Sequence, residues 1–296
     1  TMTQLVLLGT GTPNACPENS GPATAVVVDG KAYIFDFGPG VVRQCSKAYF
    51  KGIRALHPKN LDTAFCTHLH TDHTAGLPDL LFTPWVLERE NPLRLIGPEG
   101  LQHMAEYITK AYAADLDMRL NGYEPANLTG YKTIVKELKS GEKDYGVVYA
   151  DEHIQVEAFS VDHGRLQSLG YKCITKDKII VISGDTRPSP VLVEKAKGAD
   201  ILLHEVEYTK GLQARTPQWQ QYHRNVHTLS TDLAAIATEA KPKLVVTYHR
   251  IYHMDIFSTE LDVQKEMAKR NEAILQEIKD AGYEGKVVNG QDLDVF

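Results

Sequence analysis

The 296-residue sequence has few cysteines, no long apolar run and no excess of positive charge. Its four cysteines form no CxxC pair, which excludes a zinc knuckle or a dithiol redox motif. No stretch approaches the roughly 18 to 20 apolar residues that span a bilayer, and Leu5–Leu8 is too short for a signal-peptide core. We therefore expect a soluble chain without a membrane partner. Since it begins Thr1-Met2, we expect it to be cytoplasmic or exported with a removed signal.

Basic residues are outnumbered, because 32 Lys+Arg stand against 38 Asp+Glu and give a formal net charge of −6 at pH 7. This balance disfavours a surface built to neutralise a nucleic-acid backbone. A Gly-x-Ser-x-Gly motif is also absent, and no cysteine has an evident histidine partner, so a protein nucleophile is not indicated. With 43% hydrophobic residues, the composition is that of an ordinary globular protein with a full core.

Short apolar strands interleaved with single helices predict an α/β chain (α+β in its details). We expect one domain over residues 1–296, with an insertion or lid at about 83–145 that centres on the polar stretch 116–144. A hairpin is expected from 25–29 and 32–36, closed by Gly30-Lys31. Other expected strands are 4–8, 62–66, 93–96, 147–150, 154–161, 168–174, 179–183, 201–204 and 244–249, and expected helices are 41–49, 100–113, 189–196, 231–240 and 259–281.

The strongest chemical signal is the segment His68-Leu69-His70-Thr71-Asp72-His73, which follows the predicted strand 62–66 directly. Imidazole nitrogens and carboxylate oxygens are the ligands of zinc-like ions. In an extended His-x-His the two rings project to the same side, so His68 and His70 can chelate one ion. Asp72 and His73, after the turn, can face a second ion. The competing interpretation is a polar surface loop.

Three later residues stand at strand ends or turns where ligands are expected. Asp185 follows the apolar strand 179–183 and a glycine, a place where α/β sheets expose functional side chains. His163 lies in Asp162-His163-Gly164, and His249 closes the strand 244–249. Each one alone would be a turn residue or a hydrogen-bonded histidine. Together with the histidine cluster they favour metal ligation.

The segment 67–76 (THLHTDHTAG) resembles the HxHxDH signature of the metallo-β-lactamase superfamily. Motifs at 9–13, 35–40, 162–164 and 183–186, followed by His249, stand in the order that this superfamily requires. Among its branches, the chain looks most like the ribonuclease Z and arylsulfatase-like group. The resemblance implies a four-layer αβ/βα sandwich with metals at the strand ends.

The resemblance also implies how the ligands are shared between two divalent ions. One ion would be held by His68, His70 and His163, and the other by Asp72, His73 and His249. Asp185 would bridge them. Zinc is the first expectation, and manganese, iron and nickel are alternatives because His and Asp ligands accept all of them. Two ions roughly 3.5 to 4 Å apart can hold a bridging hydroxide and stabilise charge on the attacked ester.

Beside Asp72, the expected catalytic residues are His227 and Glu205. In the ribonuclease Z-like group, a histidine at the position of His227 contacts the scissile group, so we interpret His227 as a general acid or oxyanion contact oriented by Glu205. Alternatively, His227 merely precedes a helix. Asp36 is expected to orient a ligand histidine by accepting its second N–H, or else to be a turn residue. The remaining histidines, His223 and His253 among them, are interpreted as surface or packing residues.

Three functions remain open from the sequence. The first is a dinuclear hydrolase of small phosphodiester or aryl sulfate esters. The second is a ribonuclease Z-type tRNA 3′-end endonuclease, although ribonuclease Z carries a long basic arm where this chain has only about 20 residues between His163 and Asp185. The arm's absence makes nucleic acid an unfavoured partner. The third is a catalytically idle metal-binding scaffold. The resemblance also implies a homodimer.

Overall fold

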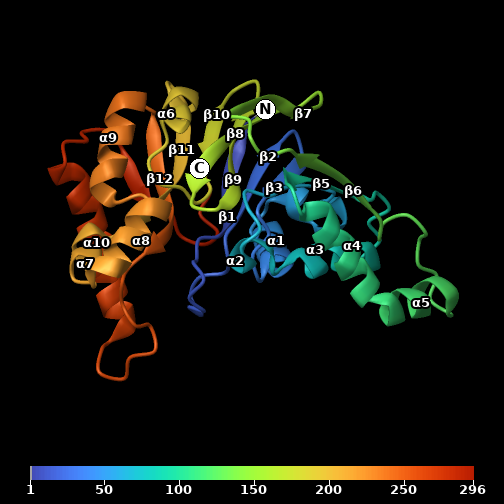
Figure 1. Cartoon of the computed structure of the whole chain (residues 1–296). Helices are drawn as coiled ribbons and strands as arrows, with labels where there is room; N and C mark the ends of the chain where they lie inside the picture. Colours follow the sequence, from blue (N-terminus) through green and yellow to red (C-terminus); the bar gives the residue numbers. More distant parts are fainter. Residues whose placement is uncertain (1) are drawn as a thin grey trace. The chain divides into compact units, whose positions relative to one another are not determined.

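The computed structural model describes residues 2–296 of the chain, which form two β-sheets with flanking helices (Figure 1). The chain divides into two compact units. Unit 1 comprises the chain up to Gly9, Glu18–Ser140 and Asp292–Phe296, and unit 2 comprises Thr10–Pro17 and Gly141–Gln291. The predicted α/β class is confirmed.

Unit 1 contains a six-stranded sheet in the order β1-β2-β3-β4-β5-β6. The first three strands pair antiparallel, and β3 to β6 are parallel. The strands are β1 (Gln4–Gly9), β2 (Ala23–Val28), β3 (Lys31–Phe35), β4 (Thr63–Phe65), β5 (Leu93–Pro98) and β6 (Thr133–Leu138). The helices are α1 (Val41–Phe50), α2 (Thr71–Thr74), α3 (Leu77–Val86), α4 (Leu101–Ala111) and α5 (Ala113–Asn121), with 3₁₀ turns at Arg54–Leu56 and Pro58–Asn60.

Alternate residues of each strand point to the same face of the sheet, and one such face contributes to the core of unit 1. Val6 and Leu8 of β1 join one buried cluster with Val41 of α1 and Trp85 of α3. The alternate residues of the same strands are buried too, so these strands are apolar on both faces. Continuous apolar strands are typical of sheets that are covered on both sides.

Unit 2 contains a seven-stranded sheet in the order β13-β12-β11-β10-β9-β8-β7. Strands β7 to β10 pair antiparallel, and β10 to β13 are parallel. The strands are β7 (Asp144–Ala150), β8 (Gln155–His163), β9 (Leu166–Ile174), β10 (Ile179–Ile182), β11 (Ile201–Glu207), β12 (Leu244–Ile251) and β13 (Val287–Asn289). The helices are α6 (Pro190–Ala196), α7 (Thr209–Gln213), α8 (Pro217–Val226), α9 (Ser230–Ala240) and α10 (Val263–Asp280).

Helices α6, α9 and α10 pack on the parallel half of this sheet (Figure 1). Leu192 of α6 and Ile236 of α9 join a buried cluster with Val181 of β10. Ile274 of α10 packs in a second cluster with Val245 of β12. These helices cover the strands whose ends carry the polar residues described below.

Several predicted element boundaries differ from those of the structure, and two of the differences have clear local reasons. The hairpin turn is Asp29-Gly30 instead of Gly30-Lys31, because both of its residues adopt left-handed φ values of 52° and 75°, which Asp and Gly tolerate. The last helix begins at Val263 instead of residue 259, because the Asp262 side chain accepts a hydrogen bond from Lys265 N and caps it there.

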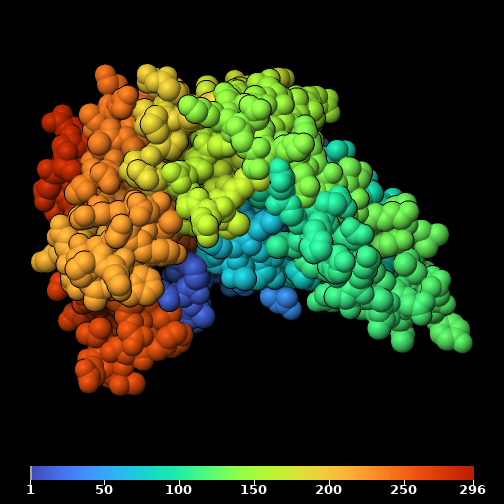
Figure 2. Space-filling view, viewed as in Figure 1, coloured from blue at the N-terminus to red at the C-terminus, as the bar shows by residue number. Residues whose placement is uncertain are grey.

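The stretch 116–144 is more regular than its polar composition predicts. It contains the end of α5 and the strand β6, which pairs with β5 along six residues. Figure 2 shows the chain around α5 as a projecting part of unit 1, and Tyr123 and Met118 are exposed there. A role as a lid stays a prediction. No helix among residues 2–296 has both the length and the apolar character needed to cross a bilayer.

Candidate metal centre

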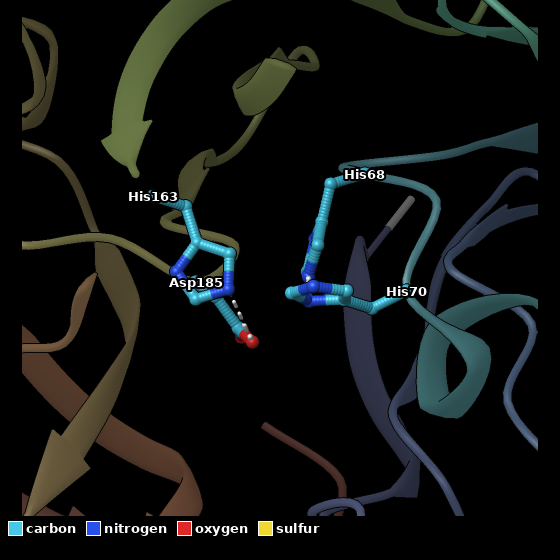
Figure 3. A group of neighbouring side chains, drawn as sticks. All are labelled: His68, His70, His163 and Asp185. Carbon is cyan, nitrogen blue, oxygen red and sulfur yellow. Dashed lines mark hydrogen bonds and ion pairs between the residues drawn. The ribbon is translucent and has the colours of Figure 1, made fainter. Parts of the chain in front are cut away.

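The histidine cluster lies at the end of β4, where the chain leaves the sheet and turns into the single-turn helix α2. His68 Nε2 and His70 Nδ1 are 3.0 Å apart, and the two rings meet edge to face (Figure 3). One turn later, His73 Nε2 is 3.4 Å from Asp72 Oδ2. The segment therefore presents two pairs of donor atoms, as the spacing of its residues predicts.

Asp36 lies behind this cluster and fixes it. Its carboxylate is buried and accepts hydrogen bonds from Thr67 N (2.7 Å), Thr67 Oγ1 (2.8 Å) and His73 Nδ1 (2.7 Å). The last bond holds the proton of His73 on Nδ1 and leaves Nε2 as the ligand atom. The predicted contact between Asp36 and a ligand histidine is present. Asp36 adopts a left-handed φ of 63°, which marks a strained backbone at this position.

Two glycines allow the cluster to approach the segment after β3. A Cβ on Gly38 would lie 2.4 Å from the carbonyl oxygen of Asp72, and one on Gly76 would lie 2.3 Å from Gly38 O. Real Cβ atoms do not come so close, so only glycine fits at either position. Gly38 and Gly76 thus allow the backbone of α2 and of the segment after it to pack directly against the segment that follows β3.

Unit 2 contributes a second group of donors, centred on Asp185. This residue follows β10 after Gly184, which has a left-handed φ of 62°. Asp185 Oδ2 is 3.8 Å from His163 Nε2 (Figure 3) and 3.3 Å from His249 Nε2. One carboxylate oxygen therefore faces both imidazoles, the arrangement expected of a bridging ligand.

His249 is aimed by a bulge in β12. The pairing of β11 with β12 skips one residue between Tyr248 and Arg250, so His249 is the extra residue, and its φ is 49°. His163 is held differently, because its Nδ1 donates a 2.6 Å hydrogen bond to Val226 O and leaves Nε2 toward Asp185. The bulge fixes the His249 ring, and the Val226 carbonyl fixes the His163 ring.

These donors fit metal ions. In a four-coordinate zinc site with bonds of about 2.0 to 2.1 Å, neighbouring ligand atoms lie about 3.3 Å apart, and the pairs within each unit span 3.0 to 3.8 Å. All seven predicted ligands except His70 are buried, and buried carboxylates need a cation or hydrogen-bond donors. The chain's histidine and aspartate clusters can therefore hold metal ions.

Glu205 and His227 form a buried pair in unit 2, as the sequence predicts. His227 Nδ1 is 2.8 Å from Glu205 Oε1, which also accepts a hydrogen bond from Thr186 N at 2.8 Å. Burial, with the charge of Asp185, raises the pKa of Glu205 well above its ordinary value. The His227 ring lies 5.1 Å from that of His163 and 5.9 Å from that of His249. A protonatable side chain thus stands against two metal-ligand candidates.

His204 gives unit 2 an acid-sensitive point. Its side chain is fully buried, Nδ1 donates to Glu205 O at 2.7 Å, and burial lowers its pKa from 6.5 to about 4. Between pH 6.5 and 4 the unfolded chain binds a proton that the folded chain does not, so stability falls as the pH falls through this window. The expected loss is about 3 kcal/mol.

We therefore expect His204→Phe to reduce the loss of unfolding free energy between pH 7 and pH 4. Urea denaturation of the wild type, His204→Phe and the exposed-residue control His103→Phe at both pH values measures it. An equal pH dependence of all three proteins would contradict this account.

Sequence reasoning missed one further group, Glu207 with His223 and His253. Glu207 Oε1 is 2.7 Å from His223 Nδ1 and 2.7 Å from His253 Nε2. A signal was present, since Glu205 and Glu207 are two apart on a strand, and His223 and His227 are four apart on a helix. Both spacings place side chains on one face, so a second Glu–His pair beside the first could have been expected.

Comparison with known proteins identifies the family. A family profile described as anti-Pycsar protein Apyc1 matches residues 3–274. The chain belongs to the Apyc1 family. It is also 30% identical over 259 residues to a ribonuclease Z of Mycobacterium bovis (strain BCG / Pasteur 1173P2), covering 84% of this chain and 86% of that relative. A ribonuclease Z of Mycobacterium marinum is 29% identical over 259 residues, covering 84% of this chain and 87% of that relative.

Solved structures agree with this assignment at the level of the fold. The short form of human tRNase Z superposes with a TM-score of 0.68 at 22% identity, covering 99% of this chain and 98% of that one. The metallo-β-lactamase fold protein YhfI of Bacillus subtilis superposes with a TM-score of 0.66 at 14% identity, covering 100% of both chains. This Apyc1-family chain is thus a metal-dependent hydrolase of the metallo-β-lactamase superfamily, and the predicted superfamily is confirmed.

The predicted absence of a long arm is also seen within unit 2. Strands β9 and β10 join through a turn in which Thr175 N donates to Lys178 O at 3.0 Å. Among the described residues, the segment between His163 and Asp185 consists of β9, this turn, β10 and the two short links that flank them.

Proposed function

We propose that this chain is a dinuclear metal-dependent phosphodiesterase that hydrolyses a small ester. The observation that carries the proposal is the Glu205–His227 pair, which is buried against the metal-ligand candidates His163 and His249. A metal-ligand set with a separate proton donor suits the cleavage of an ester whose leaving oxygen must be protonated. The proposed ligands are those that the sequence predicts: His68, His70, Asp72, His73, His163, Asp185 and His249.

Each proposed residue has a stated task. Two divalent ions, zinc first, would supply Lewis acidity and activate a water for attack on the ester. Asp185 Oδ2, which faces His163 and His249, would be a metal ligand together with them. Asp36 keeps His73, and Val226 O keeps His163, in the tautomer that leaves Nε2 as the ligand atom. Asp72 would add a hard anionic ligand beside His73.

His227 would hold the proton for the leaving oxygen. Because its Nδ1 is engaged by Glu205 Oε1, Nε2 is the nitrogen that can reach a bound ester. Glu205 is completely buried and also accepts from Thr186 N, so its carboxyl group cannot turn away from His227 without breaking that bond. Glu205 therefore orients the ring.

A phosphodiester is favoured over an aryl sulfate, and a small ester over tRNA. The mycobacterial relatives carry the name ribonuclease Z, and a ribonuclease cleaves phosphodiester bonds. The short β9–β10 turn and the net charge of −6 remove two features by which a protein grips a long phosphate backbone. Endonucleolytic cleavage of tRNA, supported by the same relatives, is the second candidate function.

His227→Ala is expected to lower turnover of an alkyl phosphodiester by about 10²- to 10⁴-fold, because it removes the proton donor on which a basic leaving oxygen depends. Both metal ions should stay bound, since His227 is not among the proposed ligands. Steady-state kinetics with metal content measured on the same sample checks both statements. A smaller loss is expected on an ester with a very acidic leaving group, which needs no proton.

The matched control is His153→Ala, which removes another imidazole of unit 2 whose ion pair is with Glu152 at 3.4 Å. It should leave turnover within about twofold of the wild type. Unchanged turnover of His227→Ala would remove this residue from the mechanism, and loss of metal from it would make His227 a ligand.

A further inference from the structure

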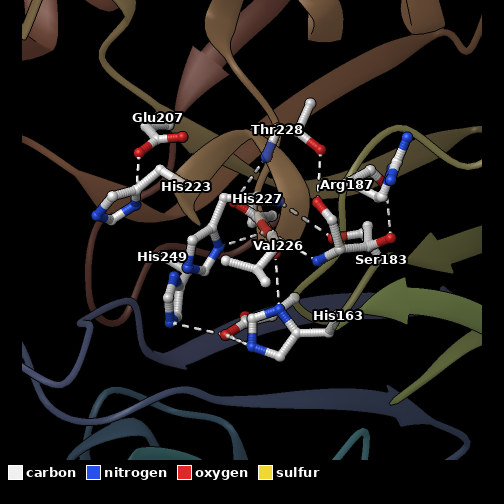
Figure 4. A network of polar contacts seen from close by, with 12 residues as sticks. His163, Ser183, Arg187, Glu207, His223, Val226, His227, Thr228 and His249 are labelled. Carbon is white, nitrogen blue, oxygen red and sulfur yellow. Dashed lines mark hydrogen bonds and ion pairs between the residues drawn. The ribbon is translucent and has the colours of Figure 1, made fainter. Parts of the chain in front are cut away.

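A second group of potential metal ligands lies in unit 2 and is not among the seven proposed for the hydrolytic centre. Glu207 ends β11, His223 lies in α8 one helical turn before His227, and His253 follows β12. One donor atom from each lies within 4.8 Å of the other two. Figure 4 shows Glu207 and His223 side by side in the polar network that also contains His227.

The three side chains converge on one carboxylate oxygen. Glu207 Oε1 is 2.7 Å from His223 Nδ1 and 2.7 Å from His253 Nε2. The side chains of Glu207 and His253 are buried, and that of His223 is 12% exposed, which leaves an approach to the group from solvent. Although burial raises it, the close contacts with the two histidines lower the pKa of Glu207 to about 2. The carboxylate is an anion at neutral pH.

The position of His253 is fixed by its backbone. Its φ of 57° is left-handed, and Arg270 Nη1 donates a 2.8 Å hydrogen bond to its carbonyl oxygen. Gly211 of α7 packs so closely that a Cβ there would lie 3.0 Å from His253 Cβ. A strained residue held from two sides is typical of positions where a side chain must be aimed.

We propose that Glu207, His223 and His253 form a separate binding site for one divalent transition-metal ion of the zinc type. Two imidazoles and a carboxylate are an established protein ligand set for zinc. The second oxygen of the carboxylate, Oε2, has no hydrogen-bond partner among residues 2–296, so it can add a donor atom to the ion. The N–O distances need to open only from 2.7 Å to about 3.3 Å.

Proton positions set the condition for binding. Arg215 Nη1 is 3.1 Å from His253 Nδ1, and a guanidinium only donates, so Nδ1 accepts and the proton of His253 is on Nε2. When an ion takes that Nε2, the proton moves to Nδ1. An ion that takes His223 Nδ1 needs the proton of that neutral ring on Nε2, so two neutral rings can bind the ion without releasing a proton.

Arg215 opposes the ion in both charge and hydrogen bonding. After the proton shift its N–H would face the N–H of His253, so the guanidinium must turn away, and its positive charge repels the cation. Arg215 also lies over the ring of Trp219 at 4.8 Å, a contact that gives the side chain an alternative partner. Arg215 therefore lowers the affinity of this site for a cation.

An ion at this site would join three elements of unit 2: the end of β11, helix α8 and the segment after β12. Since α8 leads directly into His227, the ion would also brace the helix that carries the proposed proton donor. It would stabilise unit 2 by mass action, because the unfolded chain does not hold the three ligands together.

The test is the number of metal ions per chain, read as a difference between variants. Wild type, Glu207→Gln, His223→Ala and Arg215→Gln are equilibrated with Zn²⁺ buffered by a chelator, and bound zinc is counted by elemental analysis. We expect Glu207→Gln and His223→Ala to bind one ion fewer than the wild type. We expect Arg215→Gln to bind that ion about tenfold more tightly, since a nearby positive charge is removed.

His153→Ala is the matched control and should keep the wild-type count. Equal counts in the wild type, Glu207→Gln and His223→Ala would overturn the proposal. Circular dichroism identifies a variant that fails to fold. In that case the zinc titration of Arg215→Gln is decisive, because this substitution lies outside the ligand set. An unchanged zinc affinity of Arg215→Gln would count against the site. The result is independent of the hydrolytic centre, whose failure would instead appear as an unchanged count in Asp185→Asn.

Discussion

Replacing Asp185 with asparagine is expected to lower phosphodiester turnover by more than about 10³-fold, because several kcal/mol of metal-derived transition-state stabilisation depend on it. Asp185 Oδ2 faces His163 Nε2 at 3.8 Å and His249 Nε2 at 3.3 Å, so it is placed to join both ligands. Asparagine keeps the shape and removes the negative charge. The expected loss appears in kcat, and the bound-metal count falls with it.

Asp162→Asn is the matched control for this experiment. Asp162 also belongs to unit 2, but its side chain is exposed and its ion pair with Arg187 is long, at 3.9 Å. Such a surface pair contributes little, so turnover should stay within about twofold. Turnover of Asp185→Asn within about tenfold of the wild type, with metal still bound, would show that Asp185 does not bridge two ions.

Replacing Arg89 with methionine is expected to lower the free energy of unfolding by about 3 to 5 kcal/mol. Arg89 is only 1% exposed, yet its guanidinium makes five hydrogen bonds, all to backbone carbonyls of unit 1. The acceptors are Leu61, Leu80, Leu81, Asn91 and Gly130, at 2.7 to 3.1 Å. Burial lowers the pKa of Arg89 to about 10, so the group stays charged at neutral pH.

The cost arises because methionine fills the space but leaves those carbonyls without donors. Urea denaturation at pH 7 measures the change, and Arg94→Met is the matched control because Arg94 is exposed on β5. The control should change stability by less than about 0.5 kcal/mol. Equal stability of the Arg89→Met and Arg94→Met proteins would show that the buried guanidinium does not hold these segments together.

Local patterns were enough to predict the α/β class and the ligand candidates. His68, His70, Asp72 and His73 form a contiguous motif after a strand, so their proximity follows from strand and turn geometry alone. Asp185 and His249 could be placed because the ends of parallel strands meet at one edge of a sheet. Their roles rested on the family resemblance, which the Apyc1 profile and the mycobacterial relatives support.

Residues whose partners are distant in the sequence could not be predicted. Nothing in the sequence around Arg89 marks it as buried, and only the fold brings carbonyls from positions 61 to 130 around it. Likewise, His223 and His253 were interpreted as surface or packing residues, because nothing local shows that both reach Glu207. Backbone bulges are equally hidden, and the one at His249 depends on how β12 pairs with β11.

The two boundary errors at the hairpin and at the last helix have local origins instead. The sequence Asp29-Gly30-Lys31 does not show whether the two-residue turn begins at Asp29 or at Gly30. The left-handed conformation of Asp29 in the structure places the turn at Asp29-Gly30. The helix predicted from residue 259 begins at Val263 because the Asp262 side chain caps it there. Leu261 was counted as part of the apolar helix face, but its side chain is exposed.

The most direct test of the proposed function is turnover by zinc- and manganese-reconstituted protein on three substrates side by side: a chromogenic aryl phosphodiester, an aryl sulfate and a precursor tRNA. The account predicts that the phosphodiester is hydrolysed fastest, that chelation abolishes the activity and that metal restores it. The tRNA should remain uncut. Two bound metal ions per chain with no phosphodiester turnover, or cleavage of the tRNA alone, would contradict it.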